Sequence, residues 1–267
     1  MAIYADVVRY RDLFADLFRR DLHVRYRGST LGLAWTLINP LILMGVYTLV
    51  FSVLMRIPGI AEMDYFPLFV ITGLVTWVFF QASVQAASST LVGQANLVKQ
   101  VRFPRQLLPL SVVASNLVTV GAMLVVILPF TLWLIPESRS TFWVAFPLFL
   151  PLTGLVSGLA VLVACANAFY RDVEHLVGAV LLPLFFLTPI FYNYDQLPGL
   201  EGNERLVDLL YYGNFMVPVV EAIRDPLFFG ELPNAGDVVY SVVAALVALV
   251  LGAVVFRRVD DRLAAEL

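Results

Sequence analysis

The chain of 267 residues is far more apolar than a soluble protein, since 60 % of its residues are hydrophobic and only 14 % are charged. A typical soluble domain is about 45–50 % apolar and about 25 % charged. One soluble core could not bury this much apolar surface, so the composition excludes a soluble enzyme and a disordered chain and predicts a membrane protein. The net charge of −3 and the lack of a basic tail argue against nucleic-acid binding.

Cysteine and histidine are scarce. The single cysteine, Cys165, excludes a disulfide framework, and the two histidines, His23 and His175, are far apart in the chain. We therefore expect no metal site, because a zinc site needs more ligands of these types. Charges begin at Asp6 with no short apolar core before a cleavage site, so we expect no signal peptide.

The first predicted element is an amphipathic helix over residues 3–22. Apolar residues recur there at helical spacing, with charged residues between them. We interpret it as a helix that lies in the cytoplasmic membrane interface. The alternative is a soluble helix packed against a partner subunit.

Six charge-free stretches follow, each long enough to cross a bilayer, which takes about 20 mostly apolar residues. We predict spans near 33–55, 66–88, 108–134, 142–169, 176–193 and 238–256. Six crossings leave both termini on one side. Of the 17 Lys and Arg residues, 13 lie in segments on that side and 4 on the other, so the positive-inside rule places both termini in the cytoplasm.

The cytoplasmic segment 90–106 joins the second and third spans. Asn96–Arg102 is short, basic and amphipathic, and Pro104 disfavours helix at Phe103. We predict a short helix parallel to the membrane, with Val98, Val101 and Phe103 exposed to enter a groove of a partner. The alternative is a basic anchor on anionic headgroups. The chain has no G-x-x-x-x-G-K-[ST] phosphate loop, so an ATPase that drives transport would be another chain.

The region 195–237 lies on the outer side and is too apolar for an ordinary loop. Its apolar parts are too short to cross the bilayer and are broken by Gly213, Pro218 and Pro226. We predict two short re-entrant helices that dip into the outer leaflet. The alternative is a small external cap.

No charged residue lies in the middle of a predicted span, which argues against an ion-coupled carrier. The side chains within the spans that could contact a polar substrate are therefore neutral amides and aromatic rings. Gln81 and Gln85 share a helix face, and together with deep aromatic side chains they would suit passage of a sugar chain. The alternatives are helix–helix hydrogen bonding for the amides and lipid-facing packing for the rings. The candidate channel-lining residues are Tyr47, Phe51, Trp77, Phe80, Gln81, Gln85, Phe186 and Tyr192.

Nothing in the sequence indicates catalysis. Asp172, Glu174 and His175 cluster after the fourth span beside Arg171, and we interpret them as a solvated turn. A membrane-embedded transferase acting on polyprenyl-linked sugars would need an acidic cluster at one membrane face, which the separate acidic pairs do not supply.

Three segments together resemble a known family. The first follows the pattern R-Y-[RK]-x-[ST]-x-L-G-x-x-W-x-x-x-x-P-L, and the others are NLVKQVRFPRQLLPL and NAFYRDVEHLV. The pattern is carried by Arg25, Tyr26, Arg27, Ser29, Leu31, Gly32, Trp35 and Pro40. The chain thereby resembles the ABC-2 type permeases that export polysaccharides, over essentially its whole length.

The resemblance implies an all-α membrane protein of one domain, with six transmembrane helices, an N-terminal interface helix and external gate helices. It implies a homodimer in the bacterial cytoplasmic membrane, with a channel between protomers and an undecaprenyl-type lipid-linked polysaccharide as cargo. It also implies two copies of a nucleotide-binding ATPase, which would bind ATP and Mg²⁺, so this chain itself would hold no cofactor.

The resemblance also implies roles for individual residues. Arg25, Tyr26 and Arg27 would lie at the cytoplasmic entrance near the pyrophosphate of the carrier lipid, because guanidinium is a bidentate phosphate ligand. The residues expected to couple to the ATPase are Asn96, Val98, Lys99, Val101, Arg102, Phe103 and Arg105. The alternative within transport is an ABC-2 exporter of drugs or lipids.

Overall fold

The computed structural model describes residues 2–26, 28–29, 32–54, 63–100, 103–194 and 203–266, and within these ranges the regular structure is helical with no strand. Five short 3₁₀ or π segments in the described residues serve only as helix extensions or turns. The helices are α1 (Ala2–Arg9), α2 (Arg11–Tyr26), α3 (Trp35–Tyr47), α4 (Phe66–Gly93), α5 (Ala95–Gln100), α6 (Leu107–Leu134), α7 (Ala145–Phe169), α8 (Val173–Leu187), α9 (Glu204–Gly213), α10 (Met216–Arg224) and α11 (Ala235–Glu266).

Five apolar helices are long enough to cross a membrane, which makes the chain an integral membrane protein. They correspond to five of the predicted spans, and α4 and α11 extend beyond the predicted limits on the side where the chain ends. The first span comprises α3 and a π-helical continuation, η2 (Thr48–Leu54). The bent pair α9 and α10, with a bend of 89°, is either a sixth broken span or a re-entrant loop.

The predicted span 176–193 is wrong at its outer end. The helix there, α8, ends at Leu187 after 15 residues, or about 22 Å at 1.5 Å per residue. Pro189 disfavours helical backbone at Thr188, which is extended with ψ of 129°. Residues 188–194 form turns, and they carry buried side chains back against the bundle.

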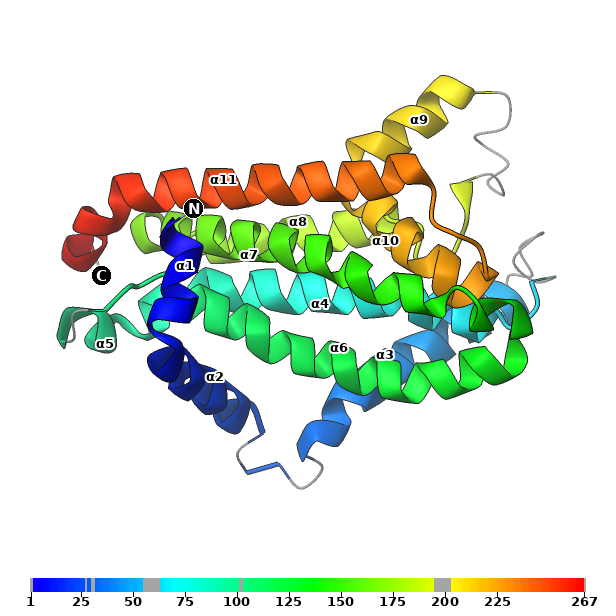
Figure 1. Ribbon diagram of the computed structural model, residues 1–267, viewed down its shortest axis with the longest axis horizontal. Helices are drawn as coiled ribbons and strands as arrows, with labels where there is room; N and C mark the ends of the chain where they lie inside the picture. The colour runs from blue at the N-terminus through cyan, green and yellow to red at the C-terminus, as the bar shows by residue number, and fades with distance from the viewer. Residues whose placement is uncertain are drawn as a thin grey trace.

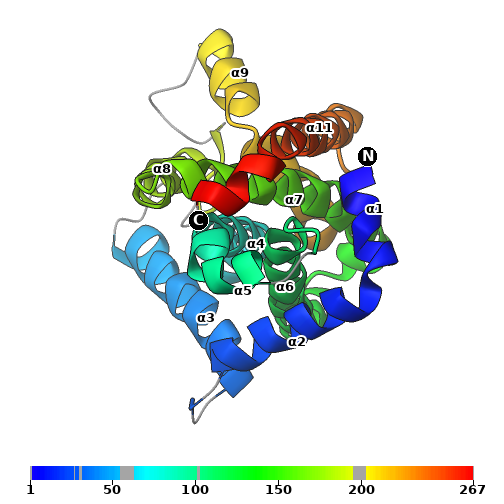
Figure 2. The same ribbon diagram turned by 90° about the vertical axis from the view of Figure 1, so that its left-hand side faces the viewer.

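The single N-terminal helix predicted over residues 3–22 is two helices that meet at Tyr10. Figure 2 shows α2 running beside α6 while α1 turns toward α11. Leu17 of α2 is buried in a cluster with apolar residues of α5, α6, α7 and α11. The apolar face of this segment therefore contacts the protein. Asp6, Arg20 and Asp21 are partly buried and bond to side chains elsewhere in the chain, whereas the other charged residues described in the segment are exposed.

Helix α4 is the centre of the bundle. In its most apolar window 72 % of the residues are buried, against 6 % for the span Leu37–Leu54 that contains α3. Around α4 pack α3, α6, α7, α8 and α10. The peripheral α3 therefore presents its apolar surface to lipid or to another subunit.

Small residues allow α7 and α11 to approach closely. Gly158 of α7 lies against the backbone of Ala248, and Gly252 of α11 lies against the carbonyl of Gly158. Lipid tails are as apolar as leucine, so close packing rather than the hydrophobic effect holds such helices together. Gly154 and Gly158 form the G-x-x-x-G spacing that permits this contact.

We expect Gly158→Val to destabilise the helix pair, because a Cβ at this position collides with backbone atoms of Ala248. Overpacking of this kind costs about 1–3 kcal/mol. The matched control is Gly121→Val on α6, where a Cβ meets open space. The measurement is the fraction of detergent-purified protein that stays monodisperse after heating. Equal losses for the two variants would contradict the assigned contact.

Both chain ends and α5 lie at one end of the bundle, as Figure 1 shows. The segment that joins the second and third spans therefore lies at the same end of the bundle as both termini. Figure 1 also shows α10 within the opposite half of the bundle and α9 projecting away from it.

Candidate translocation and coupling surfaces

A continuous series of aromatic rings runs through the part of the bundle formed by α3, the end of α8 and the segments after it, and we refer to it as the aromatic series. Tyr47 of α3 stacks on Phe191 at 4.9 Å between ring centroids, and Phe51 stacks on the same ring at 4.7 Å. Phe185 and Phe186 at the end of α8 adjoin Phe191. The series continues through ring contacts no longer than 6.3 Å to Tyr192, Tyr194, Tyr211, Tyr212 and Tyr240.

The tyrosines after α8 also complete the end of that helix. The last carbonyl groups of a helix have no partner within it. The Tyr192 hydroxyl donates to the carbonyl of Phe186 at 2.8 Å, and the Tyr194 hydroxyl donates to that of Leu187 at 2.6 Å. These bonds fix both rings, and they explain why the chain can turn sharply at residues 188–194.

Six of the eight predicted channel residues lie at accessible positions. Phe186 and Gln81 are exposed, while Tyr47, Phe51, Gln85 and Tyr192 are half-buried. The other two are corrections: Trp77 is 1 % exposed and Phe80 is 3 % exposed, both within the core around α4. A side chain buried within the protomer does not contact a passing substrate, so these two are removed from the set.

Trp77 has a positioning role instead. Its indole Nε1 donates to Oε1 of Gln81 at 2.8 Å, one helical turn further on. The carbonyl of Gln81 is thereby held toward the core, and its NH₂ group is the part that can donate to a ligand. Gln85 comes one turn later and faces Gly178 of α8.

The segment predicted to couple to a partner is partly as expected. Asn96 and Lys99 are exposed on α5, and Phe103 is half-buried. The prediction that Val98 is exposed is wrong: it is 3 % exposed and packs in the second core cluster with Leu91 and Leu107. The apolar face of α5 packs against the same chain, so only its polar face is available to contact a partner. Val101 and Arg102 lie outside the described residues.

Hydrogen bonds join the coupling segment to three other elements. Arg20 of α2 donates to Oε1 of Gln94 at 2.5 Å, and Gln106 donates from Nε2 to Oδ2 of Asp6 in α1 at 2.6 Å. Nη1 of Arg105 donates to the carbonyl of Asp260 in α11 and lies 3.0 Å from its Oδ1. A displacement of α5 would therefore be passed to α1, α2 and α11 together.

Residues 13–228 match the family model described as ABC-2 type transporter. The chain belongs to the ABC-2 type transporter family. It is similar to the O-antigen export system permease protein RfbA of Myxococcus xanthus, with 33 % identity over 236 residues that cover 86 % of this chain and 85 % of that protein. The protein of the same name from Klebsiella pneumoniae is 26 % identical over 254 residues, covering 95 % and 94 %. The resemblance seen in the sequence is confirmed.

The match includes most of the permease's candidate surfaces. It runs from α2 through the coupling segment and the aromatic series to Phe228, and Tyr240 lies beyond it. The predicted entrance residues Arg25 and Tyr26 end α2, but only their helical backbone is described. Arg27 and residues 195–202 of the predicted re-entrant region lie outside the described residues.

Sequence reasoning missed a buried cation in the half of the permease opposite the chain ends. Arg224 of α10 lies in the region 195–237, predicted to be an outer segment, and it is fully buried. Its Nη1 is 2.8 Å from Oε1 of Glu221, its Nη2 donates to the carbonyl of Ile190 at 3.1 Å, and its guanidinium carbon lies 4.0 Å from the centre of the Phe69 ring. One side chain thus ties α10 to α4 and to the turn after α8. The only signal in the sequence is the spacing of Glu221 and Arg224 by three residues within an apolar segment.

Proposed function

We propose that the permease is the transmembrane subunit of an ATP-driven exporter that moves a lipid-linked polysaccharide from the cytoplasm outward. The aromatic series is the observation that carries the proposal. It brings together rings of α3, α8 and the following turn, and Trp77, which contacts Phe185 of the series, bonds to the amide of Gln81. Sugar C–H faces stack on aromatic planes, and amides donate to hydroxyl groups. The names of the relatives from Myxococcus xanthus and Klebsiella pneumoniae support the same class of cargo.

A channel for a glycan strand would form between two protomers. Only 6 % of the residues in the span containing α3 are fully buried within one chain, and the span carries Tyr47 and Phe51 of the aromatic series. A homodimer that pairs these faces would enclose the rings, and α9 and α10 would act as its external gate. Arg25, Tyr26 and Arg27 would lie at the cytoplasmic entrance, where guanidinium groups suit the pyrophosphate of an undecaprenyl-type carrier.

Two copies of a separate ABC ATPase would supply the energy and would bind ATP and Mg²⁺. The exposed Asn96 and Lys99 of α5, with Arg105 behind them, are the surface offered to it. The permease would sit in the bacterial cytoplasmic membrane with α5 and both termini in the cytoplasm. The excess of Lys and Arg in the segments on that side supports this orientation.

The deciding experiment reconstitutes the permease with its ATPase in proteoliposomes and measures ATP hydrolysis. We expect stimulation by lipid-linked glycan isolated from the same cells. Stimulation by hydrophobic drugs or phospholipid, and none by the glycan, would overturn the proposal in favour of a drug or lipid exporter.

We expect the double variant Phe186→Ala/Tyr192→Ala to reduce glycan export roughly tenfold, the equivalent of about 1.4 kcal/mol of lost stacking. Both rings belong to the accessible part of the aromatic series. The matched control is Trp133→Ala, which removes a ring that is 72 % exposed on α6 and outside the series. Export is measured as glycan that reaches the outer face per ATP hydrolysed. Unchanged export in the double variant would remove these rings from the pathway.

A further inference from the structure

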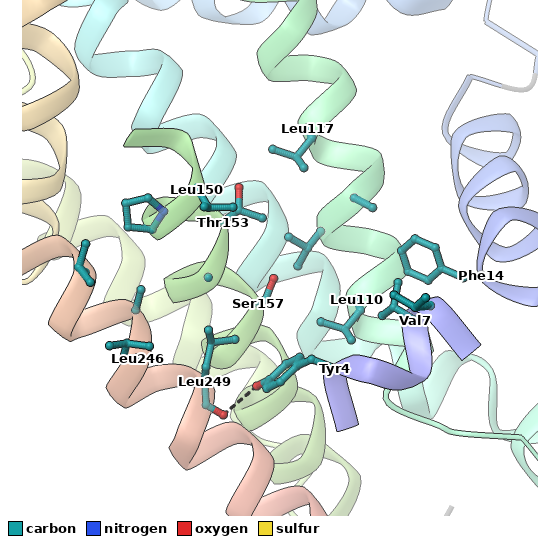
Figure 3. Close-up of a pocket in the computed structure, with 17 residues that line it drawn as sticks. Tyr4, Val7, Phe14, Leu110, Leu117, Leu150, Thr153, Ser157, Leu246 and Leu249 are labelled. Atoms are coloured by element: carbon teal, nitrogen blue, oxygen red, sulfur yellow. Dashed lines mark hydrogen bonds between the residues drawn. The ribbon is translucent and has the colours of Figure 1, made fainter. Parts of the chain in front are cut away.

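An open groove lies between α1, α6, α7 and α11, with a volume of about 690 Å³ (Figure 3). Its walls are aliphatic side chains from the three long helices, among them Leu110, Leu117, Leu150 and Leu246. Tyr4, Val7 and Phe14 of the N-terminal helices close one end, as Figure 3 shows. The groove therefore has three helical walls, and a separate segment of the chain, α1 and the start of α2, covers one end; we refer to this segment as the roof.

Two of the three polar side chains that line the groove, Tyr4 and Thr153, are hydrogen-bonded to the protein itself; the third is Ser157. The Tyr4 hydroxyl donates to the carbonyl of Leu249 in α11 at 2.9 Å. Burial, and to a lesser extent the nearby Cys165, raises the pKa of Tyr4 to about 12, so the hydroxyl remains a donor at physiological pH. The Thr153 hydroxyl donates to the carbonyl of Phe149 at 2.7 Å. The groove is thus built to accept an alkyl chain rather than a sugar or another polar ligand.

The position of the groove separates it from the aromatic series. Figure 2 shows α1 on the opposite side of the bundle from α3 and α8. The walls belong to α6, α7 and α11, which are long and apolar enough to cross the membrane. The solvent on this side is lipid hydrocarbon, and a chain held on three sides gains dispersion contacts that a chain on a flat surface lacks.

The length of the groove favours an acyl chain over a polyprenyl chain. The lining comprises residues 110–117 of α6 and 242–249 of α11, so each of these walls contributes about 10 Å at 1.5 Å per residue. The hydrocarbon of one leaflet is about 15 Å deep, half of the roughly 30 Å core. Walls of this length contact most of a fatty acyl chain of one leaflet, whereas a polyprenyl tail is several times longer.

Two exposed cations flank the junction of α1 and α2 beside the roof. Arg9 ends α1 and Arg11 begins α2. Asp12 lies 3.9 Å from Arg11 at a highly exposed position, where ion pairing is weak, and Asp6 is engaged by Gln106. An anionic headgroup would meet both guanidinium groups at the membrane surface.

We propose that the groove binds one acyl chain of an anionic phospholipid from the cytoplasmic leaflet, with its phosphate near Arg9 and Arg11. The orientation rests on the proposed function, which places α1 at the cytoplasmic interface. The bound lipid fills the space beneath α1 and holds this helix against α6, α7 and α11. The site is a resident lipid site on the outer wall of the permease and is separate from the path of the cargo.

Native mass spectrometry of the full-length permease tests the site, with phosphatidylglycerol, phosphatidylcholine and a polyprenyl phosphate as probes. The variants Ala114→Phe and Ser157→Phe place a ring in the groove from α6 and α7. The matched control is Val125→Phe, which adds the same ring at a highly exposed position on α6. We expect wild type and control to retain one phosphatidylglycerol, and the groove variants to retain at least tenfold less. Equal retention in all of them, or preferential retention of polyprenyl phosphate, would overturn the proposal.

A second measurement needs no groove variant. Phosphatidylglycerol with a photoreactive acyl chain should label peptides of α6 and α11 in wild-type protein, and labelling confined to α3 or α8 would contradict the site. Arg9→Gln/Arg11→Gln should abolish the preference for phosphatidylglycerol over phosphatidylcholine, and an unchanged preference would refute the headgroup assignment. None of these readouts depends on transport, so failure of the lipid site is distinguishable from failure of the export proposal.

Discussion

Replacing Arg224 by Met is expected to destabilise the permease by about 3–5 kcal/mol, the range for breaking a buried ion pair by removing one partner. Arg224 is fully buried, and the side chain of Glu221 is 12 % exposed, so the variant leaves a carboxylate poorly hydrated and without this cation. It also removes the donor to the carbonyl of Ile190 and the cation over the ring of Phe69.

The same contacts make Arg224 a positioning residue for α10, α4 and the turn after α8. A Cβ at Gly73 of α4 would collide with Nη2 of Arg224, so the guanidinium occupies space that only glycine leaves free. Arg224→Lys keeps the charge, but it loses the planar group that reaches Glu221 and Ile190 at once. We therefore expect the lysine variant to be intermediate.

The control is the double variant Glu221→Gln/Arg224→Met. The double variant also removes the carboxylate that loses Arg224 in the single variant, so it should cost less than Arg224→Met alone. A second control, Arg205→Met, changes an exposed arginine on α9 and should have little effect. The measurement is the temperature at which detergent-purified protein aggregates. A double variant no more stable than the single one would show that the ion pair is not the cause.

The sequence places the spans well but defines some of their ends poorly. In lipid every backbone polar group must be satisfied within the segment, so long charge-free runs must be helices, and five predicted spans correspond to such helices. Because this stretch contains no charged residue, its composition does not show where α8 ends. The helix ends at Leu187 because Pro189 follows and because two tyrosine hydroxyl groups donate to its last carbonyl groups, where the N–H groups of a further helical turn would otherwise donate.

The sequence cannot decide which face of an apolar helix is buried. Trp77 and Phe186 both lie within predicted spans, yet the first is in the core around α4 and the second is half exposed on α8. Hydrophobic periodicity carries no signal when every face is apolar. The error at Val98 has a different cause: an amphipathic pattern shows that one face is apolar, but it does not show whether that face meets a partner or the same chain.

The second large effect is expected on export when Arg105 is replaced, because Arg105 joins the coupling segment to the last helix, α11. Its Nη1 donates both to the backbone carbonyl and to the carboxylate of Asp260, near the end of α11. If α5 moves with the ATPase, as proposed, this contact passes the movement to α11 and through it to α7. We expect Arg105→Met to leave ATP hydrolysis within about twofold of wild type while export falls roughly tenfold, equivalent to about 1.4 kcal/mol of lost coupling.

Asp260→Asn is the matched control for this coupling. The carbonyl of residue 260 remains as an acceptor in Asp260→Asn, and an amide oxygen replaces the carboxylate, so Arg105 keeps two acceptors and loses only the charge pairing. That pairing is weak, since the side chain of Asp260 is 46 % exposed and salt screens such pairs. Export should therefore fall less than twofold in Asp260→Asn and about tenfold in Arg105→Met, measured as glycan exported per ATP hydrolysed in the same proteoliposomes. If both variants lose export equally, the ion pair rather than the backbone contact transmits the movement; if neither does, α11 is not driven through Arg105.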